Sequence, residues 1–600
     1  MIKIIKNIFT VFDKRFIKNY LLIQILIIIS SIFELLSIVS IGPFIAVLFN
    51  KKLIFSNIYI NTVYSFFGFS SEENFLLFLG ILSFFILFLV AIFSVITNYI
   101  VISFSQNYGY ELGNKLFKFY LDKKWIFYLK NSKNELISKI QVDIIRFTNE
   151  ILRPLLIINS KIILAVFIFF LLAFVNWHLA LISIVFFSLF YVLFYIFIRK
   201  IILLNSINIS ARSSERIKIL NESFYGIKQI FLNDLRDYFY KKFFITNKII
   251  SKSLANNLIL SQIPKNLLEI LSLFLIIFVI LFLTKVFNND FFLIFPIVAI
   301  YSLSAFKLIP ALQQIYTSFV SIKGSYASFE NINRDLRDSL HLEKKYLNPN
   351  ISKKNNSPNL FVHSLTFKNV SFRYPLNKKN ILKKINFRIL KNEKVAIVGL
   401  NGSGKSTLLD LILGLLKPSS GNVYIDNNLL TDSRVHIWQD KISYIYQNSV
   451  LFEGTILDNI VFGVKDKRNI NYSKIDSIIA QVGIQHLLKK LYQGINSQIG
   501  ENGSALSGGQ KQKIILARSL YKDSNIIVID EGTSALDNFS EKIIMNHFIN
   551  KIKDKTVIIV SHKINLLKKV DKIILIKNGK IKAIGSYDNI KANKSFQELM

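Results

Sequence analysis

Residues 395–416 read VAIVGLNGSGKSTLLDLILGLL, and this stretch sets the character of the second half of the chain. It contains G-x-x-x-x-G-K-[ST], the loop that cradles nucleotide phosphates, between an apolar strand and an apolar helical pattern. Backbone N–H groups and the helix N-terminus of such a loop face the phosphates, and its lysine reaches the β- and γ-phosphates. The predicted phosphate-binding residues are Gly399, Leu400, Asn401, Gly402, Ser403, Gly404, Lys405, Ser406 and Thr407.

An acidic pair follows a second apolar run further along the chain. Ile526–Ile529 leads directly into Asp530 and Glu531. Buried strands of open α/β sheets carry such groups to the edge where ligands bind. We therefore predict that Asp530 and the Ser406 hydroxyl hold Mg²⁺ and that Glu531 polarises the attacking water.

A second anion-binding turn precedes this acidic pair. The sequence Leu-Ser-Gly-Gly-Gln opens a helical pattern, and a helix N-terminus favours an anion. Its residues are Leu506, Ser507, Gly508, Gly509 and Gln510. One nucleotide cannot easily occupy two separate phosphate cradles on one domain. This turn is therefore expected to face the nucleotide of a second copy, which predicts a homodimer.

The first half of the chain is apolar enough to lie in a membrane. Nearly uncharged stretches cover residues 21–49, 75–105, 155–198, 266–284 and 291–322. A membrane helix needs roughly 20 apolar residues, and 155–198 is long enough for two that hinge near Asn176, so six spans are predicted. The intervening segments 106–153 and 199–265 hold nine and twelve Lys and Arg residues. Positive loops stay in the cytoplasm, which places both termini there, and the helical patterning predicts long cytoplasmic extensions of the spans.

The amino-acid composition and charge argue against several classes of protein. Of the 600 residues 52% are hydrophobic and 19% charged, which does not suit a wholly soluble or a disordered chain. The formal net charge of +36 could indicate nucleic acid, but the basic residues flank apolar runs and fit an anionic membrane surface better. The basic residues among 1–20 predict an interfacial helix, with a frayed tail as the alternative. Cysteine is absent, which excludes disulfides and a cysteine nucleophile.

In this order and spacing the motifs resemble those of an ATP-binding cassette (ABC) exporter half-transporter with a type IV, B-family-like fold. The resemblance covers nearly the whole chain and implies ATP and Mg²⁺ as ligands. It implies that Tyr374 stacks on adenine and that Gln447 senses Mg²⁺ and the transmembrane helices. It also implies that Asp537 lies in the loop that crosses the dimer seam and that His562 contacts the γ-phosphate.

Three positions depart from the common pattern of that family. Gly532 stands where Ala or Pro is usual, Tyr446 where Pro is frequent, and Lys563 where Arg is frequent. None of these changes removes a reacting group. Both sites of a homodimer are therefore expected to hydrolyse ATP.

The membrane half resembles lipid-linked oligosaccharide flippases of the PglK type. Apolar residues at helical spacing between the first two spans predict an outer amphipathic helix over about residues 54–69, with Gly68 as its stop. In that group, basic residues in the cavity attract the pyrophosphate of the substrate. Lys307, where the group prefers Arg, and Lys265 are the corresponding candidates here, and Glu34 is a candidate structural partner of such cations.

The predicted architecture is an α-helical transmembrane domain with six helices followed by an α/β P-loop nucleotide-binding domain. The expected boundaries are 1–20 for the interfacial helix, 21–325 for the transmembrane domain, 326–360 for a linker and 361–600 for the nucleotide-binding domain. The expected function is ATP-driven flipping of a lipid-linked glycan across a bacterial cytoplasmic membrane, with no nucleic-acid partner. The alternatives are export of another lipid, a peptide or a drug, a nucleotide-gated channel, and a soluble ABC protein.

Overall fold

The computed structural model describes residues 7–10, 12–49, 51–286, 291–346, 361–375, 377, 379–445, 450–530, 538–561 and 563–598. The chain forms two compact units. The first comprises Met1–Lys123 and Phe127–Ile351, and the second comprises Lys124–Ile126 and Ser352–Met600.

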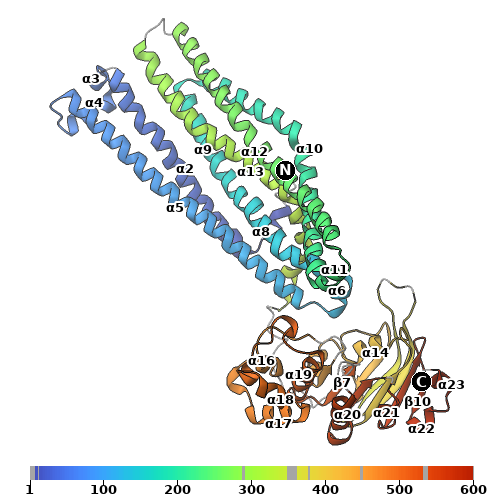
Figure 1. The fold of residues 1–600 in the computed structure, drawn as a ribbon. Coiled ribbons are helices and arrows are strands. Elements are labelled where there is room, and N and C mark those ends of the chain that lie inside the picture. The colour runs from blue at the N-terminus through green and yellow to red at the C-terminus, as the bar shows by residue number, and fades with distance from the viewer. Residues whose placement is uncertain are drawn as a thin grey trace. The chain divides into compact units, whose positions relative to one another are not determined.

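The first unit is a bundle of long helices. Its described part contains six helical stretches that are long and apolar enough to cross a membrane, as predicted. They are α2 (Lys14–Phe49), α5 (Glu72–Leu121), the run from Lys133 to Val175, α10 (Trp177–Tyr225), α12 (Arg236–Val286) and α13 (Phe291–Tyr346). Figure 1 shows α2 and α5 running side by side along their length. The predicted hinge is present, because Asn176 breaks the helix and its side chain accepts a hydrogen bond from Leu179 N at 3.2 Å to start α10.

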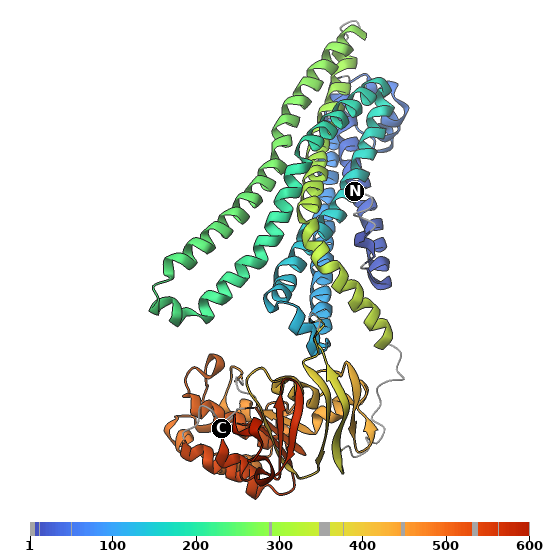
Figure 2. The same cartoon turned by 90° about the vertical axis from the view of Figure 1, so that its right-hand side faces the viewer.

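The predicted helical extensions are also present. The helices α10 and α12 are joined by the short α11 (Ile227–Leu232), and α6 (Trp125–Lys130) follows the end of α5. Figure 2 shows that α10 and α12 stay together but diverge from the other helices of the bundle toward α11.

The predicted linker begins too early. Residues 326–346 continue α13 as a helix, so only the part beyond Tyr346 can be a linker. The physical reason is burial: Phe329, Ile332 and Leu336 pack in an apolar cluster of the first unit. Ile8, Phe12 and Phe16 join that same cluster, so the described part of the predicted interfacial helix has its apolar side against protein.

A polar seam joins the third helical run to α13. This run consists of α7 (Lys133–Ser138), the π-helical turn η1 (Lys139–Asp143), α8 (Ile144–Phe147), a second π-helical turn η2 (Thr148–Leu152) and α9 (Arg153–Val175). Four polar contacts follow one another along the seam, each between one residue of this run and one of α13. They join Lys139 to Asp335 at 3.0 Å, Asp143 to Asn331 at 3.3 Å, Arg146 to Ser328 at 2.7 Å, and Glu150 to Ser321. The order of these pairs shows that the two helices run antiparallel.

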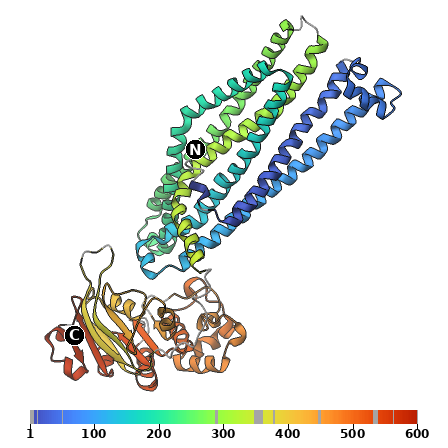
Figure 3. The ribbon, with the colours of Figure 1, turned by 180° about the vertical axis from the view of Figure 1, so that it is seen from behind.

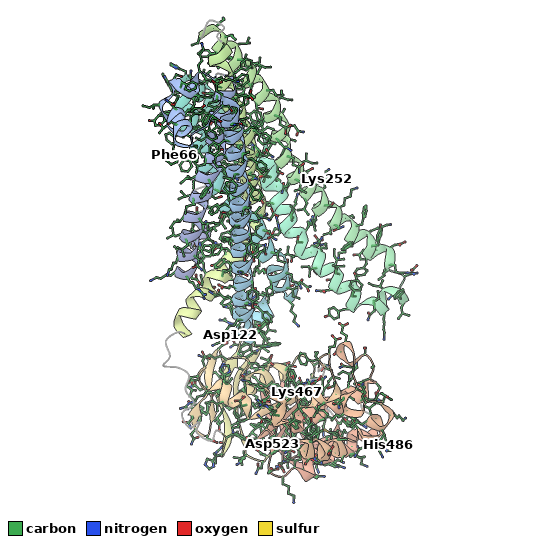
Figure 4. All side chains as sticks on the ribbon, turned by 90° about the vertical axis from the view of Figure 1, so that its left-hand side faces the viewer. Phe66, Asp122, Lys252, Lys467, His486 and Asp523 are labelled. Atoms are coloured by element: carbon green, nitrogen blue, oxygen red, sulfur yellow. The ribbon has the colours of Figure 1, made fainter. Side chains whose placement is uncertain are left out.

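The predicted outer segment is helical. It forms α3 (Leu53–Ser56) and α4 (Ile58–Phe66), and Gly68 follows with a φ of +63°, the left-handed conformation that ends a helix. The Asn57 side chain caps α4 by accepting from Tyr59 N at 3.0 Å. Tyr59 and Phe66 are 81% and 82% exposed, and Figure 4 shows Phe66 at this end of the bundle. An exposed aromatic edge of this kind suits a membrane interface.

The second unit contains two sheets. Four strands are ordered β2-β1-β4-β5 and six are ordered β10-β9-β3-β8-β7-β6. Their bounds are β1 (Ser364–Phe372), β2 (Leu382–Leu390), β3 (Lys394–Val398), β4 (Ser420–Ile425), β5 (Asn428–Leu429), β6 (Ile442–Ile445), β7 (Ile526–Asp530), β8 (Thr556–Val560), β9 (Lys572–Lys577) and β10 (Lys580–Gly585). Neighbours from β9 to β6 pair in parallel, so the predicted parallel sheet is confirmed.

Helices flank these sheets. They are α14 (Lys405–Ile412), α15 (Val435–Asp440), α16 (Ile456–Ile460), α17 (Tyr472–Val482), α18 (Gln485–Lys490), α19 (Gly508–Tyr521), α20 (Asn538–Asn546) with the π turn η7 (His547–Lys551), α21 (Ile564–Leu567), α22 (Tyr587–Ile590) and α23 (Lys594–Gln597). Short 3₁₀ turns cover Lys467–Asn469, Gly494–Asn496 and Glu501–Gly503. Figure 3 shows α16 to α18, in orange, gathered apart from the strands.

The six-stranded sheet separates two apolar cores. Along β3, Val395 and Ile397 point into one core while Ala396 and Val398 point into the other, as the two-residue period of a strand requires. The first core also takes the apolar residues of α14 and of the four-stranded sheet. The second takes those of α16, α17 and α19.

Candidate functional site

The phosphate loop follows β3 and ends in α14, as predicted. Gly402 and Gly404 have φ of +78° and +105°, values that L side chains rarely adopt. A Cβ on Gly399 would lie 2.3 Å from the Ile576 carbonyl oxygen, so the start of the loop admits no side chain. A Cβ on Gly402 would meet nothing within 4 Å, which leaves that part of the loop open to a ligand.

Polar groups of this loop fit a nucleotide phosphate. Lys405 is buried, and its Nζ donates to the carbonyl oxygens of Gly399 and Leu400, the latter at 3.2 Å. The Ser403 Oγ is buried and has no hydrogen-bond partner among the described residues. Ser406 is exposed at the first turn of α14. The loop therefore combines a cation, an unused hydroxyl and a helix N-terminus at one place.

The acidic strand ends beside this loop. The strands β3 and β7 are both paired to β8 in parallel, so Gly399, which follows β3, and Asp530, the last residue of β7, lie at the same edge of the sheet. The Tyr444 hydroxyl donates to an Asp530 carboxylate oxygen at 3.1 Å, a contact that the sequence did not indicate.

Asp410 on α14 is a second acidic group that sequence reasoning missed. Burial, with repulsion from Asp530 as the smaller cause, raises the pKa of Asp410 to about 6. Asp410 could have been singled out from the sequence, because it is a charged residue within the apolar helical pattern that follows the loop. A charge in such a position suggests a specific role.

The predicted second anion-binding turn is followed by a helix, α19, which begins after Ser507. Ser507 caps α19: its hydroxyl accepts from Gln510 N at 3.3 Å, and the Gln510 Oε1 accepts from Ser507 N at 2.8 Å. Leu506 is buried in the core beneath, while Ser507 and Gly508 are exposed. The N-terminus of α19 is thus rigidly held and open to solvent.

The helices that follow the two predicted phosphate cradles pack on opposite faces of one sheet. Leu408 and Leu409 of α14 pack on one face of the six-stranded sheet, and Ile514 and Leu516 of α19 pack on the other. The helices that provide the two N-termini are therefore separated by the sheet, which supports assigning them to two different nucleotides.

Tyr374 lies next to the phosphate loop. Its hydroxyl is 3.2 Å from the Thr407 Oγ1 and its ring meets Phe372 edge to face, with centroids 4.9 Å apart. The structure therefore brings Tyr374 next to the loop at the start of α14, and Asp530 close enough to Asp410 of the same helix to affect its pKa. Stacking of Tyr374 on a base stays a prediction.

Four predicted site residues, Gln447, Glu531, Asp537 and His562, lie outside the described residues. The strands β6, β7 and β8 end at Ile445, Asp530 and Val560, at the same edge of the sheet as β3. Three of the four residues follow these strand ends in the chain. The roles of all four stay predictions.

Lys563, which departs from the family pattern, forms an ion pair with Glu541 of α20. Glu541 is 6% exposed, whereas the Lys563 side chain is about half exposed. The pair ties the helix that follows Asp537 to the residue that follows His562. Sequence reasoning missed Glu541, because nothing in a single sequence links two charges 22 positions apart.

Among the described residues, no hydrogen bond or ion pair joins the three charged residues predicted as candidates for a substrate cavity to one another. Glu34 of α2 accepts from the Lys161 Nζ of α9 at 3.3 Å, which makes it a structural partner of that lysine. Lys265 lies 4.0 Å from Glu269 on α12, and both side chains are more than half exposed. Lys307 is partly buried on α13.

Comparisons with known proteins agree with this geometry. Residues 382–534 match the ABC transporter family model. A solved structure, a bacterial Atm1-family ABC exporter with ATP bound, superposes with a TM-score of 0.76 over 98% of both chains at 19% identity. The chain has the ABC exporter fold.

Curated relatives match over part of the chain. They include the ATP-dependent lipid A-core flippase of Cupriavidus pinatubonensis, 31% identical over 228 residues, 38% of this chain. They also include multidrug resistance protein 1 of Entamoeba histolytica, 35% identical over 233 residues, 39% of this chain. The chain spans 39% and 18% of the length of these two relatives.

Proposed function

We propose that this ABC exporter fold is an ATP-driven translocase that works as a homodimer. The observation that carries this proposal is the packing of the helices that follow the two predicted phosphate cradles on opposite faces of one sheet. In a symmetric pair, Lys405 of one copy and Ser507 of the other hold the same ATP between them. Closure of this sandwich draws the two sheets together, and hydrolysis releases them, which makes ATP a ligand that biases a two-state switch.

The groups around the phosphate loop have different roles in binding and hydrolysing ATP. Lys405 and the loop N–H groups bind the phosphates, and Tyr374 supports the base. Ser406, Asp530 and Gln447 would hold a Mg²⁺ ion, which supplies charge neutralisation on the phosphates when bound. Glu531 orients the attacking water and His562 contacts the γ-phosphate. Tyr444 holds the Asp530 carboxylate in place.

A substitution at the predicted base tests this assignment. Glu531→Gln should bind ATP with nearly parental affinity but lower the hydrolysis rate by at least 100-fold, as loss of a general base does. It should also trap a closed ATP-bound dimer, measurable by size-exclusion chromatography with light scattering. Hydrolysis by this variant at the parental rate would refute the role of Glu531.

The proposed substrate is an amphipathic, lipid-linked glycan. The exposed aromatic edge of α4 supports it, because such an edge suits lipid at the membrane interface. The names of the relatives include a lipid A-core flippase and a multidrug resistance protein, so another lipid, a peptide or a drug is the second candidate. A nucleotide-gated channel is the alternative of another class.

Reconstituted vesicles separate these substrates. The purified protein should translocate lipid-linked glycan in the presence of ATP and Mg²⁺, while Glu531→Gln should not. Transport of peptides or drugs without movement of the lipid would favour the second candidate. A current that persists without hydrolysis would favour the channel.

The proposed location is a bacterial cytoplasmic (inner) membrane with both termini in the cytoplasm. Basic segments between the apolar helices support this orientation. Single cysteines added to this cysteine-free chain at Lys252 and at Tyr59 should report it: a membrane-impermeant thiol reagent applied to whole cells should label position 59 and not position 252.

A further inference from the structure

A half-open cavity of about 620 Å³ lies in the first unit, lined by α9, α10 and α13 and by Leu275 of α12. Its wall is almost entirely aliphatic and aromatic, with Phe169 from α9, Phe187 from α10 and Leu312 from α13 among the lining residues. Neither Glu34, Lys265 nor Lys307 lines it. The space therefore suits a hydrocarbon ligand, and the charged candidates from the sequence do not define it.

The lining of this cavity extends far along two helices. Its lining runs from Tyr301 to Phe319 on α13 and from Ala180 to Tyr195 on α10. At a helical rise of 1.5 Å per residue these stretches are about 27 and 22 Å long, close to the thickness of the hydrocarbon core of a bilayer. An extended hydrocarbon chain of that length can lie along such a lined stretch.

A cation lies at one end of the lined stretch. Lys323 follows Phe319 by four residues, one helical turn, and its Nζ donates to the hydroxyl of the lining residue Tyr195 at 3.0 Å. The same Nζ is 5.0 Å from the centroid of the Tyr195 ring. Lys323 does not line the cavity itself, but its contact with the lining residue Tyr195 places it at the Tyr195–Phe319 end.

The charge of this lysine is not balanced by a carboxylate in the described part of the chain. Lys115, Lys139 and Lys161, also partly buried in this unit, pair with Asp13, Asp335 and Glu34 respectively. No such ion pair is present for Lys323 among the described residues, where its polar contact is the Tyr195 hydroxyl. A partly buried ammonium without a counter-ion favours an anionic ligand.

A second polar group lies one helical turn away. Tyr191 lines the cavity, and its hydroxyl is buried without a hydrogen-bond partner among the described residues. A buried, unpaired hydroxyl is costly, so a ligand group that accepts from it would gain affinity. Lys323, Tyr195 and Tyr191 therefore place three donors toward one end of an otherwise apolar cavity.

We infer that this cavity binds an apolar chain of an anionic amphiphile, with Lys323, Tyr195 and Tyr191 around its head group. The inference rests on the proposed function and names where one chain of the transported lipid lies. The diphosphate of an isoprenoid lipid and the carboxylate of a fatty acid share the required chemistry.

Equilibrium binding to the full-length protein in nanodiscs of neutral lipid tests the inference without ATP. The probes are tritiated farnesyl diphosphate, farnesol and oleate. Lys323→Met should weaken farnesyl diphosphate binding about tenfold or more and leave farnesol binding unchanged, because only the charged hydrogen bond is lost. Lys323→Arg should restore binding. Ala305→Trp, or Ala165→Phe if the former does not fold, fills the cavity and should weaken both ligands.

A matched control is Lys252→Met, which removes an exposed lysine of α12 (Figure 4) and should bind all probes like the parent. If Lys323→Met also weakens oleate binding, the site accepts carboxylate as well as phosphate head groups. If oleate binding is unchanged, the site is specific for phosphates. Either result supports the site. Parental farnesyl diphosphate binding by Lys323→Met, or parental farnesol binding by both filled variants, overturns it.

A vesicle assay keeps the two proposals apart. If the parental protein moves lipid with ATP but the cavity variants bind and transport like it, the inference fails and the proposed function stands. If the parental protein moves no lipid while Lys323 still governs farnesyl diphosphate binding, the site stands and the proposed function fails.

Discussion

Asp410 shows how a charged side chain next to the phosphate loop affects stability. Its pKa is raised to about 6 by burial and then by Asp530. In the unfolded chain an Asp titrates near 3.9, so the folded protein binds more protons than the unfolded chain between about pH 4 and 6. The contribution of Asp410 to stability is therefore most favourable below pH 4 and is lost as the pH rises through 6.

Asp410→Asn should remove the destabilising effect of the ionised, partly buried Asp410 carboxylate above about pH 6. At pH 7.5 the nucleotide-free variant should be more stable by about 1–2 kcal/mol, a value reduced for partial exposure, and the gain should vanish near pH 4. Thermal unfolding in detergent at several pH values measures it. Asp476→Asn, at an exposed position of α17, is the control and should change stability little at any pH. An equal gain at pH 4 and 7.5 would contradict the assignment.

Lys563 offers a second prediction for a single side chain. Lys563→Met leaves the buried Glu541 carboxylate without this partner, which should cost about 1–3 kcal/mol and lower the turnover number for ATP. Lys563→Arg keeps the charge and should behave like the parent. Melting temperature and ATPase kinetics check both. If the Met and Arg variants behave alike, the ion pair has no such role.

Individual residues divide into those that a single sequence can identify and those that it cannot. The phosphate loop was predictable because its glycines and lysine meet a local requirement at fixed spacing. Tyr444, Glu541 and Lys161 were not, because each acts through a partner far away in the chain. Their contacts arise only when strands or helices are brought together by the fold.

At the level of elements, α5 approaches η2 closely at Gly109. A Cβ on Gly109 would lie 2.2 Å from the Thr148 Oγ1 and 3.0 Å from the Thr148 Cβ. Gly109→Ala should therefore destabilise the protein by about 1–3 kcal/mol through overpacking. Thr148→Ala in the same chain should recover part of that loss, because the hydroxyl and methyl are gone.

Thermal unfolding of the two single variants and the double variant measures this coupling. Gly113→Ala is the control, since a Cβ there would approach no closer than 3.9 Å to Ile144. Additive effects in the double variant would show that the two residues do not share the crossing.

The elements also show which features of helices are readable in sequence. The break at Asn176 was predictable, because a polar residue interrupts a long apolar run. The end of α13 was not, because residues 326–346 are rich in polar groups and yet bury Phe329, Ile332 and Leu336. The π turns η1 and η2, which pack against α13 and α5, left no local signature in the sequence.

For the whole molecule, the proposed composite sites make an asymmetric prediction. In a covalently linked tandem of two copies, Lys405→Met and Ser507→Arg in the same copy should damage both sites, because each site takes one residue from each copy. The same substitutions in different copies should leave one site intact. ATP hydrolysis by the first tandem should therefore fall to background, while the second retains measurable activity.

A site contained within a single copy reverses these outcomes. Both substitutions in one copy would then spare the other copy, and substitutions in different copies would inactivate both. The parental tandem and each singly substituted tandem are the controls. Vanadate trapping of nucleotide gives a second measure that does not depend on the turnover rate.

The position of α14 and α19 on opposite faces of one sheet bears on how such proteins diverge. Under the proposed symmetry each copy contributes one half of two separate sites, so a gene duplication would allow mutations to accumulate in one site while the other remains whole. Asymmetric descendants with a degenerate and a working site are then reachable by single substitutions, with no change in the scaffold.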